Sequence, residues 1–223
     1  MSRVLVIGGS GQGRQVIDAI VARGHHEVVG VLDRSFRRGD VVAGYPVLGT
    51  DLDLRAAALE TAADGFVVAI GDNHTRGEIL ERESGAAAHL HPAIVVHPAA
   101  TVARDATLGA GTILLAGAVV GNGCRIGRGV LLGINSSVDH DGWVDDHASL
   151  APNAATGGTV RIGRATAIGI GASVIHEATL GADTVVGAGA VVLGDLPDRV
   201  VAYGVPARVI RSREPGEPYL QRR

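Results

Sequence analysis

The sequence predicts a chain of two parts, an α/β unit followed by a parallel β-helix built from six-residue repeats. Two features of the sequence predict this fold class. From residue 96 onward an aliphatic residue recurs at every sixth position, whereas before it short β-branched runs alternate with segments of helical spacing. The composition agrees, because 46% hydrophobic but only 3% aromatic residues, with 33 glycines, suit many thin and similar layers.

The six-residue period covers 17 positions from Val96 to Val192, and Thr156 is the one that is not aliphatic. We call these positions the anchors. Such a hexapeptide period is typical of a parallel β-helix, in which each repeat forms one short strand and three repeats form one triangular coil. The residue two before an anchor is commonly small, as at Cys124, and the residue after it is often glycine. We expect glycine there because the corners demand backbone freedom.

Residues 1–90 are predicted to form a Rossmann-like domain. The runs RVLVIGG (3–9), HEVVGVLD (26–33) and GFVVAIGD (65–72) are typical of buried strands. Val16, Ile17 and Ile20 follow helical spacing up to a stop at Gly24, and a second helix is expected near 76–83. This order predicts a parallel sheet with crossover helices. Residues 91–211 are assigned to the β-helix with its C-terminal cap, and 212–223 to a flexible tail.

Charge and cysteine content exclude several classes of protein. The formal net charge is −3 and no internal run of basic residues stands out, so nucleic acid is not an expected partner. Cys124 is the single cysteine, which excludes an internal disulfide and favours the cytoplasm. Neither a signal peptide nor an apolar run of about eighteen residues is apparent, so no membrane association is expected.

The repeat is interrupted by the polar stretch SSVDHDGWVDDHAS (136–149). Asp139, His140 and Asp141 directly follow the anchor Val138, and we expect them at an outward-facing corner. An imidazole accepts a proton at neutral pH, and a neighbouring carboxylate can orient it and stabilise its charged form. The other acidic and histidine residues, 145–147, fall at the next corner. The two groups are too far apart for one coordination sphere, so no metal site is predicted.

A glycine-rich stretch, GGSGQGR (8–14), follows the first predicted strand and opens the first helix. Backbone N–H groups at such a helix start favour phosphate. The strict dinucleotide pattern fails at Arg14, so this motif alone is weak. Asp33 closes the second strand about twenty residues later, where an acidic residue usually meets a nucleoside.

Several segments together carry a family resemblance: VIGGSGQGRQVIDAI, VAIGDNHTR, HPAIVVHPAATV, SSVDHD, GGTVRIG and YGVPARVI. With them the chain resembles the left-handed β-helix acyltransferases of the sugar O- and N-acetyltransferase family. The closest sub-group N-acetylates 4-amino sugars on nucleotide diphosphates. The resemblance implies the left hand of the helix, acetyl-CoA as co-substrate without metal or redox cofactor, and a homotrimer with active sites between subunits.

The resemblance also assigns residues. It makes His140 the general base that activates the amine directly and Asp141 its orienting partner, and it leaves Cys124 to pack. It places the oxyanion donor at the Gly158 amide. Family members commonly carry a second histidine where this chain has Ser149, so Ser149 or His147 takes over that contact, or it is absent. Acetyl-CoA is expected along Gly158, Ser149, Ile175, Gly187, Pro206, Ala207 and Arg208. The nucleotide sugar is expected at Gly8, Ser10, Gly11, Asp33, Gly71, Asn73 and Arg76.

The predicted function is therefore acetyl-CoA-dependent N-acetylation of the 4-amino group of a nucleotide-linked deoxy sugar. Two alternatives stay open: O-acetylation of a sugar hydroxyl, as in sialic-acid acetyltransferases, and a non-catalytic scaffold or nucleotide-sugar sensor. The His-Asp pair and the nucleotide-type loop favour the amine. The sequence does not distinguish UDP from GDP, and it identifies neither the sugar nor the glycan pathway that the product serves.

Overall fold

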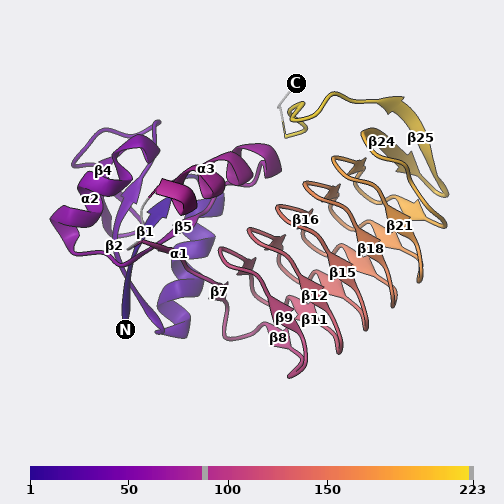
Figure 1. Cartoon of the computed structure of the whole chain (residues 1–223), viewed down its shortest axis with the longest axis horizontal. Helices are drawn as coiled ribbons and strands as arrows, with labels where there is room; N and C mark the ends of the chain where they lie inside the picture. Colours follow the sequence, from indigo (N-terminus) through magenta and orange to yellow (C-terminus); the bar gives the residue numbers. More distant parts are fainter. Residues whose placement is uncertain (87–89, 221–223) are drawn as a thin grey trace.

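The computed structural model describes residues 1–86 and 90–220. An α/β domain forms one end of the molecule, and a three-sided column of short strands leads away from it (Figure 1). The far end of the column carries a two-stranded cap, from which the chain returns toward the α/β domain (Figure 1). Within the described residues, no helix has both the length and the apolar character that crossing a membrane would require.

The N-terminal domain is a six-stranded sheet in the order β3-β4-β2-β1-β5-β6. Its pairs are parallel except β3 with β4. The three strands predicted from the sequence are β1, β2 and β5, and the two predicted helices are α1 and α3. Gly24 ends α1 in the left-handed conformation, with φ 69°. The bounds are β1 Ser2–Ile7, α1 Gly11–Arg23, β2 His26–Leu32, β3 Val41–Val42, β4 Tyr45–Gly49, η1 Asp51–Asp53, α2 Leu54–Thr61, β5 Gly65–Val68, α3 Asn73–Ala86 and β6 His91–Pro92.

The column is a β-helix with three sheets, which we call faces 1, 2 and 3, and all their strand pairs are parallel except β24 with β25. Face 1 comprises β7 Val95–Val96, β10 Ile113–Leu114, β13 Leu131–Leu132, β16 Ser149–Leu150, β19 Ala167–Ile168, β22 Val185–Val186, β24 Val200–Gly204 and β25 Ala207–Ser212. Face 2 comprises β8 Thr101–Val102, β11 Val119–Val120, β14 Ser137–Val138, β17 Ala155–Thr156, β20 Ser173–Val174 and β23 Val191–Val192. Face 3 comprises β9 Thr107–Leu108, β12 Arg125–Ile126, β15 Trp143–Val144, β18 Arg161–Ile162 and β21 Thr179–Leu180.

Each coil stacks on the next with an unbroken register of 18 residues, as in the row Ile113, Leu131 and Ser149. The anchors point inward, and those from Leu114 to Val192 are nearly all inaccessible to solvent. The small residues two positions before them, such as Ala118 and Cys124, are also fully buried and belong to the same core. The hexapeptide prediction is therefore confirmed down to the register.

The glycines that follow the anchors have a different role from the predicted one. Their φ angles do not lie in the left-handed region, but a Cβ at Gly109 would lie 2.5 Å from the carbonyl carbon of Gly127 in the next coil. These positions therefore exclude a side chain for lack of space. The left-handed residue of each corner comes two positions later, for example Gly111 with φ 74° and Asp141 with φ 56°. The prediction that the glycine directly after the anchor supplies backbone freedom was therefore wrong, because the left-handed conformation occurs two residues later.

Helix α3 is fastened to the column by one buried cation, Arg76, which is 1% exposed. Its guanidinium donates to the backbone oxygens of Gly129 (2.8 Å), His147 (2.7 Å) and Ile70 (3.0 Å), among others. The Asn73 amide donates to two further backbone oxygens of the column, both at 3.1 Å. Burial lowers the pKa of Arg76 to about 10, so it stays charged at neutral pH.

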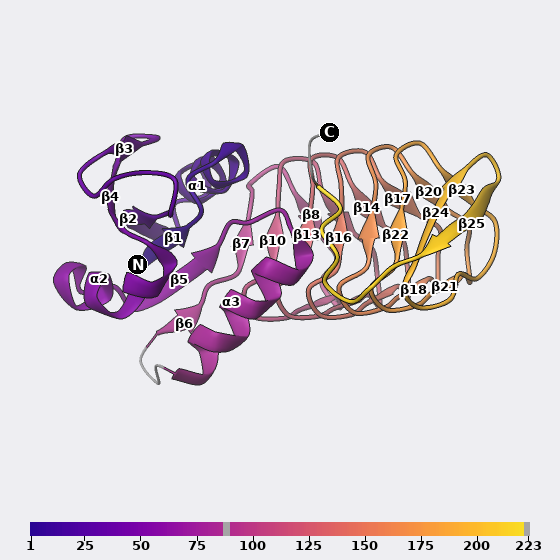
Figure 2. The same cartoon turned by 90° about the horizontal axis from the view of Figure 1, so that it is seen from above.

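The described part of the predicted tail is packed rather than free. Arg213 forms an ion pair with Asp183, and the N–H of Gly216 donates to the same carboxylate at 3.2 Å. At the end of this segment the Tyr219 hydroxyl donates to the backbone oxygen of Gly71 at 3.3 Å. Residues 213–220 thus connect the cap to the N-terminal domain, along the side of the column where α3 lies (Figure 2).

Candidate active site

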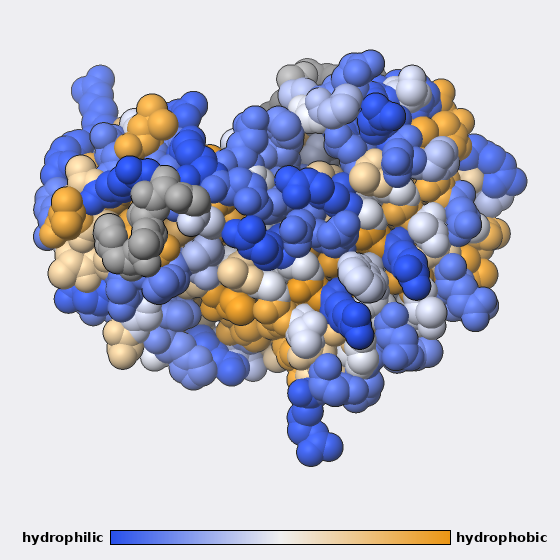
Figure 3. Space-filling model, viewed as in Figure 1, coloured by the Kyte–Doolittle hydropathy of each residue, from blue (hydrophilic) through white to orange (hydrophobic). Residues whose placement is uncertain are grey.

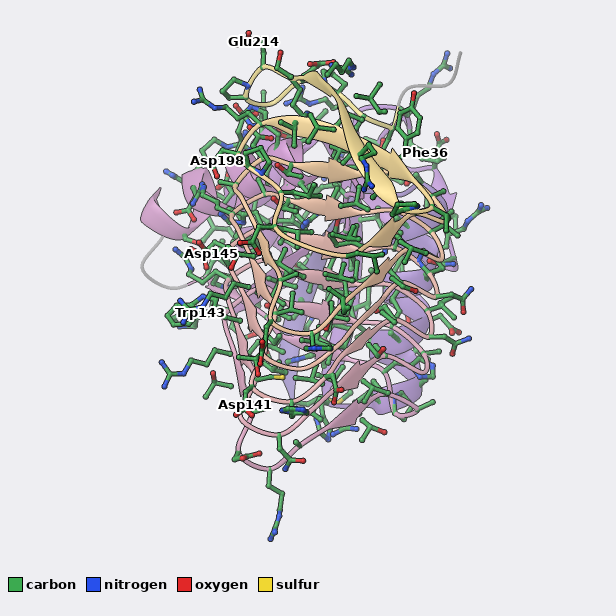
Figure 4. The ribbon with its side chains drawn as sticks, turned by 90° about the vertical axis from the view of Figure 1, so that its right-hand side faces the viewer. Phe36, Asp141, Trp143, Asp145, Asp198 and Glu214 are labelled. Carbon is green, nitrogen blue, oxygen red and sulfur yellow. The ribbon has the colours of Figure 1, made fainter. Side chains whose placement is uncertain are left out.

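The predicted His-Asp pair lies at the corner between faces 2 and 3. The Nδ1 atom of His140 is 2.9 Å from Oδ2 of Asp141, and the two side chains are 59% and 67% exposed. Figure 4, which views the column along its length, shows Asp141 at one corner, with Trp143 and Asp145 further along the adjoining side. The hydrogen bond to Asp141, with the charge of Asp139, raises the pKa of His140 above its usual value.

The strand ladder is altered at this corner by Thr156. Residues that follow an anchor usually donate their N–H to the anchor carbonyl of the next coil, as Gly121 does to Val138 at 2.8 Å. Asp139 instead donates to the side-chain hydroxyl of Thr156, at 3.3 Å. The register between β14 and β17 accordingly contains only the pair of Ser137 with Ala155. The side chain of Thr156, the single polar anchor, therefore accepts the hydrogen bond that a backbone carbonyl accepts in the other coils.

Gly158 occupies the equivalent corner position one coil further and lies directly under the His140 ring. A Cβ at this glycine would overlap the ring atoms Nε2 and Cε1 of His140. The structure therefore brings together the predicted base and the predicted oxyanion donor. Cys124 is buried behind them, with Sγ 2.9 Å from the Asp139 carbonyl oxygen, and burial raises the pKa of its thiol.

We expect Gly158→Ala to abolish most of the catalytic activity, because the added methyl group displaces the His140 ring. The glycine lies at an outer corner, so the melting temperature should change little. The steady-state kcat and a thermal melt of the same preparation test this expectation. Gly194→Ala is a control for an added methyl group on the same corner, since a Cβ there meets nothing within 4 Å, and because Gly194 lines the cap pocket the two kcat values are compared at saturating acetyl-CoA. Unchanged kcat in Gly158→Ala would show that the ring does not act from its present position.

A shallow apolar edge runs from His140 toward the cap. Ile175 and Leu193 lie on this corner in later coils and are 38% and 60% exposed. The edge leads to a pocket of about 430 Å³, the cap pocket, lined by Leu193 and by the predicted residues Pro206, Ala207 and Arg208. At the usual strand spacing, the three coils from His140 to this pocket span roughly 14 Å.

The other candidate histidine, His147, lies at the corner between faces 3 and 1. It therefore does not belong to the same site as His140. Its side chain is 1% exposed, and Nε2 lies 3.1 Å from Oε1 of Glu81 on α3. Burial, with the charge of Arg164, lowers the pKa of His147 and favours the neutral ring. Across the described residues, no group of three or more histidine, cysteine, aspartate or glutamate side chains could hold a metal ion.

The carboxyl ends of β1, β2 and β5 surround a second pocket, of about 380 Å³, which we call the strand-end pocket. Gly8 and Asp33, two of the residues predicted to bind the nucleotide sugar, line this pocket. The Asp33 carboxylate accepts from the N–H groups of Gly9 (2.6 Å) and Ser35 (2.7 Å), so it also holds the glycine loop. The prediction missed Arg34, which follows Asp33 directly and donates to the buried Asp51 at 2.5 Å.

The start of α1 is open to an anion. Ser10 is its N-cap but makes no side-chain capping bond, and no acidic residue lies in the first turn. Both Ser10 and Gly11 are exposed. The N–H groups and the positive end of the helix dipole therefore face solvent beside the strand-end pocket.

A third pocket, the flank pocket, has a volume of about 400 Å³ and lies on face 1 between α1 and residues 219–220. Ser149, Gly187 and Gly71 all line it. Figure 3 shows apolar residues gathered between the N-terminal domain and the column. Face 1 lies opposite the corner between faces 2 and 3. Within a single chain, Ser149 and Gly187 therefore lie on the other side of the column from His140.

The side chains of two residues predicted to bind the nucleotide sugar, Asn73 and Arg76, make contacts between α3 and the column. Asn73 and Arg76 are each 1% exposed, and their side-chain groups bind backbone oxygens of the column and of the chain before α3. The donor groups of both side chains therefore already have partners within the protein. Their position after a strand end resembled that of a binding residue, but only the docking of α3 on the column shows where they point.

Known proteins show the same two-part architecture. The family model described as the PglD N-terminal domain matches residues 3–82. The acetyltransferase domain of PglB from Neisseria gonorrhoeae FA1090, in complex with acetyl coenzyme A, is 34% identical, with a TM-score of 0.87, over 93% of this chain and 98% of that one. PerB from Caulobacter crescentus, in complex with CoA and GDP-perosamine, is 36% identical, with a TM-score of 0.86, over 94% of this chain and 97% of that one.

The chain belongs to the hexapeptide-repeat sugar N-acetyltransferases. This membership confirms the predicted α/β and left-handed β-helix architecture and the predicted class of enzyme, an acetyl-CoA-dependent acyltransferase. Galactoside O-acetyltransferase from Escherichia coli (strain K12) is 56% identical over 34 residues, which cover 15% of this chain and 17% of that protein. That match is confined to a short part of both chains.

Proposed function

We propose that this N-acetyltransferase transfers the acetyl group of acetyl-CoA to the 4-amino group of a nucleotide-linked deoxy sugar, with His140 as general base. The observation on which this depends is the His140–Asp141 pair, held over Gly158 at an exposed corner. The similar structures with acetyl coenzyme A, and with CoA and GDP-perosamine, support both co-substrates. We retain residues 1–90 as the nucleotide-sugar domain and 91–211 as the acetyl-transfer domain.

In the proposed reaction the neutral amine attacks the thioester carbonyl carbon and forms a C–N bond. Its proton passes to Nε2 of His140, while the Nδ1 proton donates to Asp141, which stabilises the imidazolium. The amide of Gly158 holds the oxyanion. When the C–S bond breaks, the imidazolium returns the proton to sulfur, so that CoA leaves as a thiol and the base is regenerated.

Acetyl-CoA would lie along the edge between His140 and the cap pocket. Its pantetheine arm would pass the apolar side chains of Ile175 and Leu193, and its nucleotide end would reach Pro206, Ala207 and Arg208. Arg208 offers a cation for a CoA phosphate. The nucleoside of the sugar donor would occupy the strand-end pocket, with its diphosphate at the exposed start of α1.

A second copy of the chain is needed to bring both substrates together. His140 projects from the corner opposite face 1, whereas the donor site adjoins the flank pocket on face 1. The predicted acetyl-CoA residues are divided in the same way, with Ser149 and Gly187 on face 1. We therefore propose a homotrimer in which His140 of one subunit faces the donor site of its neighbour, and sedimentation should report three chains.

The substrate assignment is tested by release of CoA thiol from acetyl-CoA. We expect turnover with UDP- or GDP-linked 4-amino sugars and none with free sialic acid. Turnover of hydroxyl acceptors alone would favour O-acetylation, to which the short match with galactoside O-acetyltransferase points. Tight binding of nucleotide sugar with no thiol release would instead indicate the non-catalytic sensor.

A further inference from the structure

The flank pocket differs chemically from the phosphate-binding start of α1. Its walls are aliphatic, including Leu131, Ile168 and Val186. Its polar side chains are all uncharged: Gln12, Gln15, Ser149 and Tyr219. Such a lining suits a small neutral group with apolar surfaces and a few hydroxyls, and it offers no partner for a phosphate or an ammonium ion.

The C-terminal segment 213–220 supplies one wall of this pocket. Arg213 is 6% exposed, pairs with Asp183, and places its guanidinium 5.9 Å from the centre of the Tyr219 ring. The Tyr219 hydroxyl donates to the Gly71 carbonyl at 3.3 Å, and Tyr219 lines the flank pocket together with Ser149. Burial raises the pKa of Tyr219, so the phenol keeps its proton at neutral pH.

The flank pocket and the proposed nucleotide site are lined by neighbouring residues of the chain. Ile70 lines the strand-end pocket, and the next residue, Gly71, lines the flank pocket. Gln12 and Gln15 extend the flank pocket along the first turns of α1, which begins at Gly11. A group joined to a nucleoside through a diphosphate at the start of α1 would therefore lie beside the flank pocket.

We propose that the flank pocket binds the deoxy-amino sugar of the donor and that Tyr219 is a positioning residue that fixes this sugar together with Ser149. The inference depends on the proposed function. The aliphatic wall meets the deoxy carbon and the C–H face of the ring, and the two hydroxyl side chains meet a ring hydroxyl. The pocket lining has no carboxylate, so it does not stabilise the ammonium form, and the amine stays in the neutral form that attacks.

The test compares Tyr219→Phe, which removes only the hydroxyl, with Tyr45→Phe as a control on β4, away from the pocket. We expect the KM for the nucleotide amino sugar to rise about fivefold in Tyr219→Phe, as loss of one neutral hydrogen bond predicts. The KM for acetyl-CoA and the melting temperature should match those of the control. A rise in the KM for acetyl-CoA instead, or an unchanged sugar KM, would overturn the proposal.

A binding experiment separates this inference from the proposed reaction, because it needs no turnover. Calorimetry compares UDP and GDP with the corresponding nucleotide-linked 4-amino sugars. We expect the wild type to bind the sugar nucleotide more tightly than the free nucleotide. In Tyr219→Phe this difference in affinity should be smaller, while the affinity for the free nucleotide should equal that of the wild type. If the wild type binds the sugar nucleotide no more tightly than the free nucleotide, the flank pocket is not the sugar site. If binding follows expectation but no CoA is released, the proposed reaction fails and the sugar site stands.

Discussion

His140→Ala should lower kcat at least about a hundredfold, the lower end of what a positioned general base contributes. The ring is 59% exposed in one chain, so its removal leaves no cavity in the core, and the melting temperature should stay within a degree or two of the wild type. Arg104→Ala is a suitable control, since this exposed side chain lies on the same corner two coils before His140, on the side away from the cap pocket. If His140→Ala retains near-normal turnover, another group removes the proton.

The partner carboxylate makes the same expectation dependent on pH. Asp141 raises the pKa of His140, so the neutral ring that acts as base is lost as the pH falls through this raised pKa. Asp141→Asn should lower the pKa, and the acid limb of the kcat profile should move to lower pH. The plateau should also fall, because the imidazolium loses its stabilising charge. Asparagine tolerates the left-handed φ of 56° at this position, so the change should not strain the corner. An acid limb at the wild-type position would show that Asp141 does not act on the base.

Arg76→Met should cause the largest loss of stability. The side chain is fully buried and donates to backbone oxygens of both the column and the chain before α3, including those of Gly129, His147 and Ile70. Each buried acceptor left without a donor costs about 1–3 kcal/mol. We therefore expect a loss of about 3 kcal/mol or more, which for a chain of this size lowers the melting temperature by roughly 6–12 °C.

Two further variants make the Arg76 experiment decisive. Arg161→Met removes an exposed arginine from face 3 and should change the melting temperature by a degree or less. Arg76→Lys keeps the charge but cannot reach the same set of oxygens with a single ammonium group, so it should recover only part of the loss. If the melting temperature of Arg76→Met equals that of the wild type, α3 is held to the column by other contacts.

The sequence was sufficient for the fold because the β-helix is determined locally. Each anchor is buried by the coils directly above and below it, so the same inward position recurs at a fixed step and the register can be counted. The outward position of His140 and Asp141 was predictable for the same reason, since the residues after Val138 must turn a corner, whereas the choice of this pair as the site came from the family resemblance. Thr156 stood out in the sequence as the one polar anchor, although only the structure shows that its hydroxyl accepts from the Asp139 amide.

The rest depended on contacts between residues far apart in the chain. Asn73 and Arg76 follow a strand end, as ligand-binding residues often do, yet the docking of α3 on the column buries them. Tyr219 belongs to a segment that composition marks as a tail, and only its return to Gly71 places it in a pocket with Ser149. Sequence alone determined the repeat and the outward histidine, because neighbours in the repeat define both. Tertiary structure decided which surfaces meet, because the docking of a helix and the path of a returning segment depend on shape and buried charge, which no period in the sequence records.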